Sequence, residues 1–445
     1  MNKLPPGPRS ALLQTVLFAR DNYSHLAECA RRYGDPFTLP TLLGPSVVTG
    51  DPEGVKEIFS ADPELFEPWA KELIAPVGGD NTMVLLTGPR HKRERKLFMP
   101  AFHGARMRSY AQIIQDVTRK HVASLAPGQR FLAQDITMAV SMEVIFRAVF
   151  GVQSEERMRE MKAVLERAAK ALKPLMLLVP ALQHQFGGYG PWASFTRAQA
   201  EVHRMFVDVI RARRQDAAEK EDILSLMLGA RDEAGQGMTE IELRDELITL
   251  LSAGHETTAT SLAWALYFVH RDRNVAQKLD AELAPLGAVP SPETLAGLPY
   301  LGAVCDEALR IRPIIPVVNR KLKAPFTLRG YTLPAGIGVV AAAGLAHFNP
   351  ITYPDPQRFY PERFLDRKFT PFEYLPYGGG ARRCLGAAFA SYEMKIVLGT
   401  ILAGQRLALV REELPAAVNR HFAISPQGGV EMRLVERRAN QTAQL

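Results

Sequence analysis

The sequence has few cysteines and no long apolar run. Only Cys29, Cys305 and Cys384 occur among 445 residues, and this sparse, odd set argues against a disulfide framework and for a reducing compartment. No stretch approaches the roughly 20 apolar residues that span a bilayer. The two most apolar pieces, residues 174–182 and 336–346, are much shorter. We therefore expect no membrane anchor.

The chain also lacks a targeting segment, repeats and linkers. Pro5 and Pro6 arrive before any apolar stretch, so no signal peptide is expected. No internal repeat and no Ser/Gly-rich linker separates the sequence into parts. We expect a cytoplasmic protein with a single domain over residues 1–445.

Charge and composition exclude few functions. The chain is 47% hydrophobic and 23% charged, so it can bury a sizeable core. Its net charge of +7 suggests an acidic partner, or weak attraction to nucleic acid or anionic lipid. So modest an excess identifies no partner, and we expect no nucleic-acid function.

Hydrophobic periodicity predicts a mainly α fold with a small β-sheet portion. Strands are expected within residues 36–49 and 326–341, and helices dominate the sequence between these two regions. The expected strands are 36–39, 46–49, 326–328, 331–333 and 338–341. The expected helices are 105–125, 138–149, 155–172, 192–220, 241–270, 274–283, 298–311 and 385–401.

The helix expected at 241–270 is long and central. Thr239 and Glu242 have the spacing of a capping box, in which each side chain satisfies a backbone N–H of the first turn. About thirty residues without proline would span roughly 45 Å. Residues 250–264 carry few charges, which indicates that this part is buried.

The strongest local signal is a glycine-rich turn that presents a thiol before a helix. It reads Pro-Tyr-Gly-Gly-Gly-Ala-Arg-Arg-Cys-Leu-Gly over residues 376–386. Glycine lets a flat ligand approach the main chain, while a helix N-terminus and adjacent arginines favour a thiolate. A phosphate-binding loop is disfavoured because neither GxGxxG nor Gly-Lys-Ser/Thr is present. A hairpin followed by a structural cysteine is the other alternative, and we expect Cys29 and Cys305 to be inert buried thiols.

This turn resembles the haem-binding loop of cytochromes P450, with Tyr377 where the family usually has Phe. The resemblance implies that Cys384 is the axial thiolate of haem b (iron protoporphyrin IX) and that Arg382 contacts a haem propionate. It likewise implies close approach of the haem at the loop glycines, which are Gly378, Gly380 and Gly386.

A second motif interrupts the long helix at residues 253–258, Ala-Gly-His-Glu-Thr-Thr. Glycine costs about 1 kcal/mol relative to alanine in a helix, and a buried carboxylate costs more. Such local violations are expected at functional sites, although a glutamate facing a solvated groove would read the same. The stretch resembles the family's oxygen-activation motif, which implies that Gly254 makes room for dioxygen and that Glu256 and Thr257 deliver protons.

Further motifs follow in the family's order. Glu307 and Arg310 at i,i+3, with Arg363 later in the chain, resemble a buried ion-pair network that holds the cysteine loop. His91 and Arg95 stand where the family commonly has Trp-x-x-x-Arg. By the same resemblance these two residues and Arg320 are further haem-propionate partners, although plain surface charges are the alternative.

The resemblance implies a monooxygenase that oxidises a small apolar substrate such as a fatty acid, terpenoid, macrocycle or drug-like molecule. A haem-thiolate isomerase or peroxygenase and a non-catalytic haem sensor are the alternatives, and the acid–alcohol pair argues against them. Pocket walls are expected from residues 69–86, 172–185 and 422–429. They are also expected from Leu250, Ala253, Ile314, Ile315, Val317 and Val318.

Electrons must come from outside, because the chain contains no flavin or iron–sulfur motif. We expect an acidic ferredoxin or a flavodoxin with its reductase, supplied by NAD(P)H. Such a carrier would dock on Lys92, Arg93, Lys96 and Arg383. A monomer is expected.

Overall fold

The computed structural model describes residues 4–69, 71–102, 106–173, 176, 182–184, 187–216, 222–420 and 423–438. The chain forms two compact units. The first contains Met1–Trp69, Tyr110–Ser141 and His255–Leu445, and the second contains Ala70–Ser109 and Met142–Gly254. Three helices run from one unit into the other, and the longest of these is α12 (Glu240–Arg271).

A five-stranded sheet lies in the first unit, with strand order β1-β2-β8-β5-β3. The hairpin β1–β2 is antiparallel, whereas β2 and β8 are parallel. Apolar side chains on the two faces of the sheet enter separate clusters, one with Leu26 and Phe37 and another with Val47 and Phe59. The strands are β1 (Phe37–Thr41), β2 (Gly44–Thr49), β3 (Phe66–Pro68), β5 (Val318–Leu322) and β8 (Gly338–Ala341).

The helices of the first unit include every one predicted for its part of the chain. The predicted bounds differ from the observed ones by a few residues, as is usual for helix ends. These helices are α1 (Ala11–Arg20), α2 (Asn22–Tyr33), α3 (Pro52–Ser60), α13 (Arg273–Leu283), α14 (Pro292–Gly297), α15 (Pro299–Ile311), α16 (Ala343–Ala346), α17 (Arg363–Asp366) and α18 (Ala387–Gly404). Two helices that also enter the second unit are α6 (Arg106–Ala123) and α7 (Ala133–Val144).

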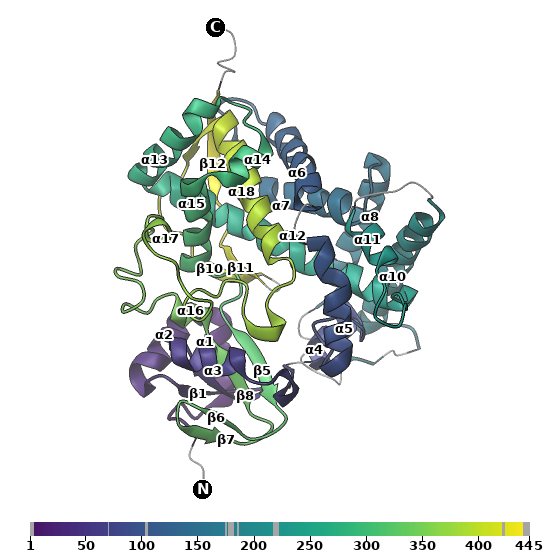
Figure 1. Ribbon diagram of the computed structural model, residues 1–445, viewed down its shortest axis with the longest axis vertical. Coiled ribbons are helices and arrows are strands. Elements are labelled where there is room, and N and C mark those ends of the chain that lie inside the picture. Colours follow the sequence, from purple (N-terminus) through teal and green to yellow (C-terminus); the bar gives the residue numbers. More distant parts are fainter. Residues whose placement is uncertain are drawn as a thin grey trace. The chain divides into compact units, whose positions relative to one another are not determined.

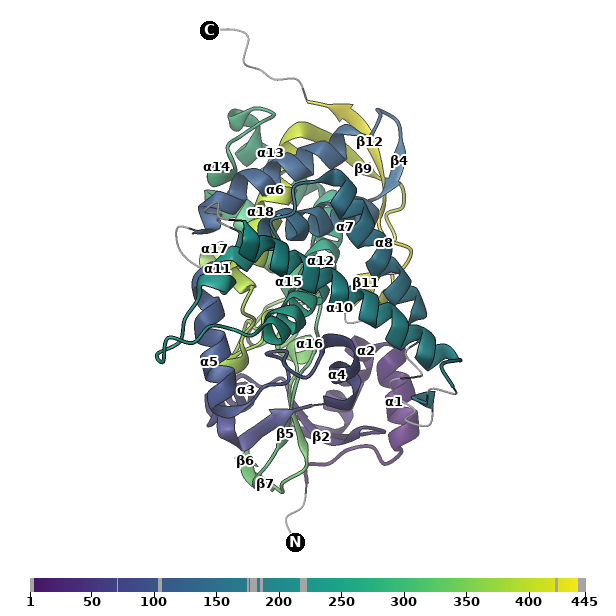
Figure 2. The ribbon, with the colours of Figure 1, turned by 90° about the vertical axis from the view of Figure 1, so that its right-hand side faces the viewer.

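Helix α18 is long and apolar enough for a membrane span by length and composition, and it is the one such helix in the part of the chain that is described. In the structure 67% of it is buried among other elements of the protein. That burial is the property of a core helix, and Figures 1 and 2 show α18 surrounded by α6, α14 and α15.

Small strands complete the first unit. The pairs β6–β7 and β10–β11 are two-stranded, and β4, β12 and β9 form a three-stranded sheet. Sequence patterns predicted β6, β7 and β8 but missed β4 and β9 to β12. The bounds are β4 (Arg130–Leu132), β6 (Phe326–Leu328), β7 (Tyr331–Leu333), β9 (Gln405–Leu409), β10 (Ala417–Arg420), β11 (Ala423–Pro426) and β12 (Glu431–Arg437).

The second unit is helical. Helices α8 and α10 pack against each other, and a π-helical turn, η3 (Ile145–Val149), extends α7. Sequence periodicity predicted one continuous helix over 138–149, and the structure divides it at Ile145. The helices are α4 (Lys71–Gly78), α5 (Gly88–Phe98), α8 (Glu155–Ala171), α10 (Pro191–Gln215) and α11 (Ile223–Gly229).

Helix α12 confirms the predicted capping box. The Thr239 N–H donates to Oε2 of Glu242 at 2.8 Å, and the Glu242 N–H donates to Oγ1 of Thr239 at 3.2 Å. Burial was predicted for residues 250–264, and the structure buries 258–269 without a break. The part before them is less uniform, because Leu250 and Thr257 are half-buried and Ala253 is exposed. Their i, i+3, i+7 spacing makes one stripe along the helix.

Candidate active site

The cysteine turn has a defined backbone. The Cys384 N–H donates to the Tyr377 carbonyl at 2.9 Å, which closes the loop on itself. Gly378 and Gly380 have φ values of +62° and +64°, a region that other residues rarely adopt. Helix α18 begins at Ala387, three residues after the cysteine, so the thiol precedes the helix and is exposed.

Two glycines let this turn lie directly against α3. A Cβ at Gly379 would collide with the ring of Phe59, and a Cβ at Gly380 would collide with the Phe59 carbonyl. A Cβ at Gly386 would meet nothing within 4 Å in the described part of the chain. Packing therefore explains Gly379 and Gly380, whereas a partner outside the chain would explain Gly386. The predicted site included Gly378, Gly380 and Gly386 but missed Gly379.

The phenol of Tyr377 is engaged away from the cysteine. Its hydroxyl lies 2.8 Å from Oγ of Ser391, on the second turn of α18. Burial raises the pKa of this phenol above its ordinary value, so it is neutral at pH 7. The contact joins the two ends of the segment that carries Cys384.

Arg320 is a buried cation beside the turn. It lies on β5 with 5% exposure, and its Nη2 donates to the Gly379 carbonyl at 2.8 Å. Its Nε is buried and has no hydrogen-bond partner among the described residues. Burial and the nearby charge of Arg382 lower the pKa of Arg320 to about 10. Two neighbouring cations with an unused donor form a place suited to a carboxylate.

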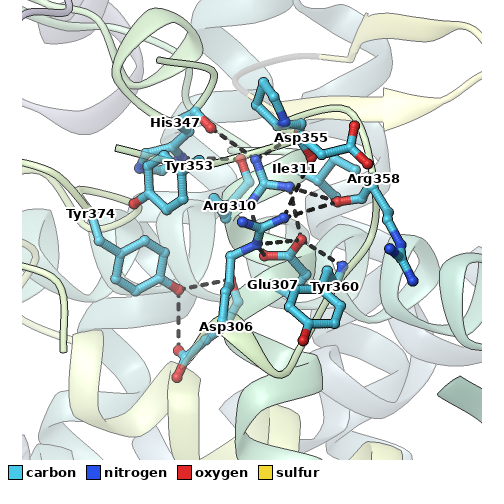
Figure 3. Close-up of polar contacts among 12 residues, drawn as sticks. Asp306, Glu307, Arg310, Ile311, His347, Tyr353, Asp355, Arg358, Tyr360 and Tyr374 are labelled. Carbon is cyan, nitrogen blue, oxygen red and sulfur yellow. Dashed lines mark hydrogen bonds and ion pairs between the residues drawn. The ribbon is translucent and has the colours of Figure 1, made fainter. Parts of the chain in front are cut away.

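Glu307 contacts both Arg310 and Arg363, the predicted ion-pair partners, and Figure 3 shows the contacts of Glu307 and Arg310. Arg310 donates from Nε and Nη2 to the two oxygens of Glu307 at 2.7 and 2.8 Å, and both side chains have no exposure. Nε of Arg363 adds a contact to Glu307 at 3.2 Å. Arg310 also donates to three backbone carbonyls, which are those of His347, Pro356 and Arg358.

His347 connects this network to the cysteine turn, and sequence reasoning missed it. Its Nδ1 lies 3.1 Å from the Arg310 carbonyl, and its Nε2 accepts from the Leu375 N–H at 2.9 Å. Burial and the charge of Arg310 lower the pKa of His347 to about 3. The ring is therefore neutral, which allows one nitrogen to donate and the other to accept.

Glu256 is buried on α12 and forms an ion pair. Its Oε1 lies 3.6 Å from Nε of Arg420 at the end of β10, where the exposed fractions of the two side chains are 7% and 47%. Hairpin β10–β11 is fixed to the same helix, because Nε1 of Trp264 donates to the Ile424 carbonyl at 3.0 Å. Arg420 escaped sequence reasoning because nothing local in the sequence links it to Glu256.

Comparison with known proteins identifies the family. The family model described as Cytochrome P450 matches residues 4–428. This chain belongs to the cytochrome P450 family. It is 36% identical over 438 residues to a protein of Mycobacterium tuberculosis provisionally named cytochrome P450 135B1, covering 97% of this chain and 91% of that protein. It is 34% identical to one provisionally named cytochrome P450 135A1, covering 98% and 96%.

Solved P450 structures share the fold. A cyanobacterial CYP120A1 with bound retinoic acid superposes with a TM-score of 0.85 at 23% identity, covering 98% of this chain and all of that one. The haem domain of cytochrome P450DA gives the same score at 24% identity, covering 98% of each chain. The predicted P450 fold is confirmed, and membership of the family supports a haem-binding monooxygenase.

The residues of the first unit fit a haem. The turn offers an exposed sulfur, and a donor on the buried Arg320 has no partner in the described structure. No group of three or more His, Cys, Asp or Glu able to hold a metal ion occurs within the described ranges. Within the turn itself Cys384 is the thiol, and a cysteine thiolate is the protein ligand of the haem iron in P450s.

The residues expected from α5 lie in the second unit. His91 is buried and Arg95 is half-buried, and their i,i+4 spacing places them on one face of the helix. Among the basic residues of α5, Nε of Arg93 pairs with Asp232 at 2.6 Å and Nζ of Lys96 pairs with Glu233 at 2.6 Å. Two of the four charges expected to dock an electron carrier thus have acidic neighbours in the loop before α12.

Gly254 packs closely inside the second unit. A Cβ there would lie 3.0 Å from Cδ1 of Ile145, in the π-helical turn η3. Glycine therefore lets α12 approach η3, which is a packing reason for this residue. The stripe of Leu250, Ala253 and Thr257 defined above is the less buried face of the helix.

The residues after α15 that were predicted to line the substrate pocket differ in what they pack against. Val318 lies 3.4 Å from where a Cβ of Gly378 would be, so it borders the cysteine turn. Val317 packs against the cluster of Leu26 and Phe37, which favours a structural role. Ile314 is buried and Ile315 is 47% exposed. Most of 172–185, and the start of 422–429, lie outside the described residues.

Proposed function

We propose that this cytochrome P450 inserts one atom of dioxygen into a small apolar substrate. The observation that carries the proposal is the acid–alcohol pair on α12, where Glu256 is 7% exposed and linked to the surface through Arg420. A buried carboxylate inside a long helix is costly. A role of Glu256 in proton delivery would explain why the helix carries a buried carboxylate despite its cost in stability.

Three residues in or beside the turn would hold the haem. Cys384 would supply the thiolate to the iron, and Arg320 with Arg382 would bind propionates. His91 and Arg95 are proposed as further propionate partners because they share one face of α5. When bound, the haem supplies oxygen activation, to which thiolate donation contributes by favouring O–O cleavage.

The overall reaction consumes R–H, O2, two electrons and two protons, and yields R–OH and water. Glu256 would take up protons at its carboxylate, and the Thr257 hydroxyl would pass them onward. The Arg420 guanidinium, 47% exposed, is where the Glu256 carboxylate meets solvent. These groups transfer protons, and the apolar stripe on α12 would orient the substrate.

The substrate is proposed to be apolar because the expected wall residues carry few charges. A fatty acid, terpenoid, macrocycle or drug-like molecule would suit such a surface. Electrons would come from NAD(P)H through a ferredoxin or flavodoxin and its reductase. Lys92 and Arg383 are exposed and are the stronger candidates for docking charges. A cytoplasmic monomer is part of the proposal.

The test of haem ligation is the carbon monoxide spectrum of the reduced protein. A thiolate-type band in the wild-type protein and its loss in Cys384→Ser are the expected results. Cys305→Ser is the matched control, since that thiol is buried and burial raises its pKa. A band that survives in Cys384→Ser would disprove the assigned ligand.

The test of monooxygenation compares two oxidant supplies. Turnover with redox partners and O2, but not with hydrogen peroxide alone, is expected, and it separates the proposal from a peroxygenase, an isomerase and a sensor. Glu256→Ala and Thr257→Ala should keep haem binding but divert electrons to peroxide. Unchanged coupling of electrons to product in both variants would remove their proposed role.

A further inference from the structure

A cavity lies in the first unit, at the C-terminal end of α18, whereas the cysteine turn precedes the N-terminal end of that helix. It has a volume of about 260 Å³, and Thr400 and Gly404, in the last turns of α18, help to line it. The helix starts at Ala387, so its two ends are about 25 Å apart at 1.5 Å per residue. Figures 1 and 2 both place α6, α18 and β12 together at this end.

The rim of the cavity is basic. Arg119, Arg437 and Arg438 line it, and no Asp or Glu does. Nη2 of Arg437 donates to two carbonyls at the end of α6, and Nη1 of Arg438 pairs with Asp280 at 2.5 Å just outside the lining. Arg119, on α6, is exposed. The guanidinium groups of Arg437 and Arg438 are thus held in place, which preorganises the rim.

The cavity wall contains polar atoms that the protein does not satisfy. Oγ1 of Thr400 and Oε1 of Gln405 are buried and have no hydrogen-bond partner among the described residues. Both residues line the cavity, with 6% and 8% exposure. Buried polar groups are nearly always paired. Atoms that are buried, unpaired and beside a cavity therefore indicate a ligand with complementary donors and acceptors.

The remaining wall is apolar and comes from Val122, Ala288, Val289 and Pro290. A ligand that fits all three features has an oxyanion, a hydroxyl and a short apolar part. We propose that this cavity binds a soluble phosphate monoester. Phosphate oxygens accept from guanidinium groups and from the Thr400 hydroxyl. The monoanionic form of the ester, present because its second pKa is about 6, keeps a P–OH that can donate to Oε1 of Gln405.

The experiment is calorimetric titration of the full-length protein with n-butyl phosphate, and separately with inorganic phosphate, at constant ionic strength set by chloride. Arg119→Gln removes a rim charge, and Thr400→Val removes the hydroxyl while keeping the shape of the side chain. Arg406→Gln is the matched control, because Arg406 is an exposed arginine on β9 that pairs with Glu436 outside the cavity.

Saturable binding of butyl phosphate is expected, tighter than that of inorganic phosphate because of the apolar wall. Arg119→Gln and Thr400→Val should each weaken it by about tenfold, and Arg406→Gln should leave it within about twofold. Equal losses in Arg119→Gln and Arg406→Gln would show general charge attraction and overturn the proposal. No saturable binding of butyl phosphate, or binding no tighter than that of inorganic phosphate, would also overturn it. None of these outcomes depends on haem or on turnover.

Discussion

Replacing Arg310 by alanine would remove a fully buried guanidinium that makes five hydrogen bonds. All five N–H groups of this guanidinium are used, two on Glu307 and three on the carbonyls of His347, Pro356 and Arg358. In the variant, Glu307 keeps only Nε of Arg363 at 3.2 Å and the Tyr360 N–H at 2.8 Å. The three carbonyls lose their donor.

Removing one partner of a buried ion pair costs about 3–5 kcal/mol, because the other charge stays buried. Each unsatisfied carbonyl adds a cost of roughly 1 kcal/mol or more, although such costs are not additive. We expect a loss of about 4–6 kcal/mol, which is a large part of the ~5–15 kcal/mol typical of folded domains. Arg310→Lys should lose less, since an ammonium keeps one charged contact but cannot form the fork.

The assay is urea unfolding followed by far-ultraviolet circular dichroism, together with the fraction of protein that retains haem. Arg433→Ala is the control, because Arg433 is exposed on β12 and should change stability by less than about 0.5 kcal/mol. Haem retention should fall with Arg310→Ala, since His347 links this network to Leu375 before the cysteine turn. If Arg310→Ala unfolds within 1 kcal/mol of the wild type, the reasoning is refuted.

Three further predictions concern Glu393, Gly380 and Arg320. Burial raises the pKa of Glu393 to about 8, so the folded protein holds a proton that the unfolded chain releases above about pH 4.5. The free energy of unfolding should therefore fall by roughly 3–5 kcal/mol as the pH rises to 8. Glu393→Gln should flatten the pH dependence of the urea midpoint. Gly380→Ala should cost about 1–3 kcal/mol, because φ is +64° and the Phe59 carbonyl blocks a Cβ, whereas Gly386→Ala should leave stability nearly unchanged; equal effects in urea unfolding would contradict this. Arg320→Gln should keep the fold but weaken haem retention about tenfold in a haem-transfer assay, and unaltered retention would exclude its contact with a propionate.

Local patterns were enough for much of the fold. The capping box at Thr239 and Glu242 formed as predicted because both partners lie within one turn of helix. Strands with clear alternation, such as β6 and β7, were placed at their observed bounds. Strand β12 was missed, since it pairs with β4 and β9, which lie elsewhere in the chain. Strands β10 and β11 were missed although they pair locally as a hairpin.

The sequence by itself determined the family, the long helix and the Glu307–Arg310 pair, because each depends on residue type at short spacing. The same kind of local pattern predicts roles for Cys384 and Glu256. Only the tertiary structure decided what those residues touch. His347 contacts both Arg310 and Leu375. Arg420, on the hairpin β10–β11, forms an ion pair with Glu256. Asp232 forms an ion pair with Arg93. Such pairings join residues far apart in the chain, so no local pattern encodes them and packing of the whole chain selects them.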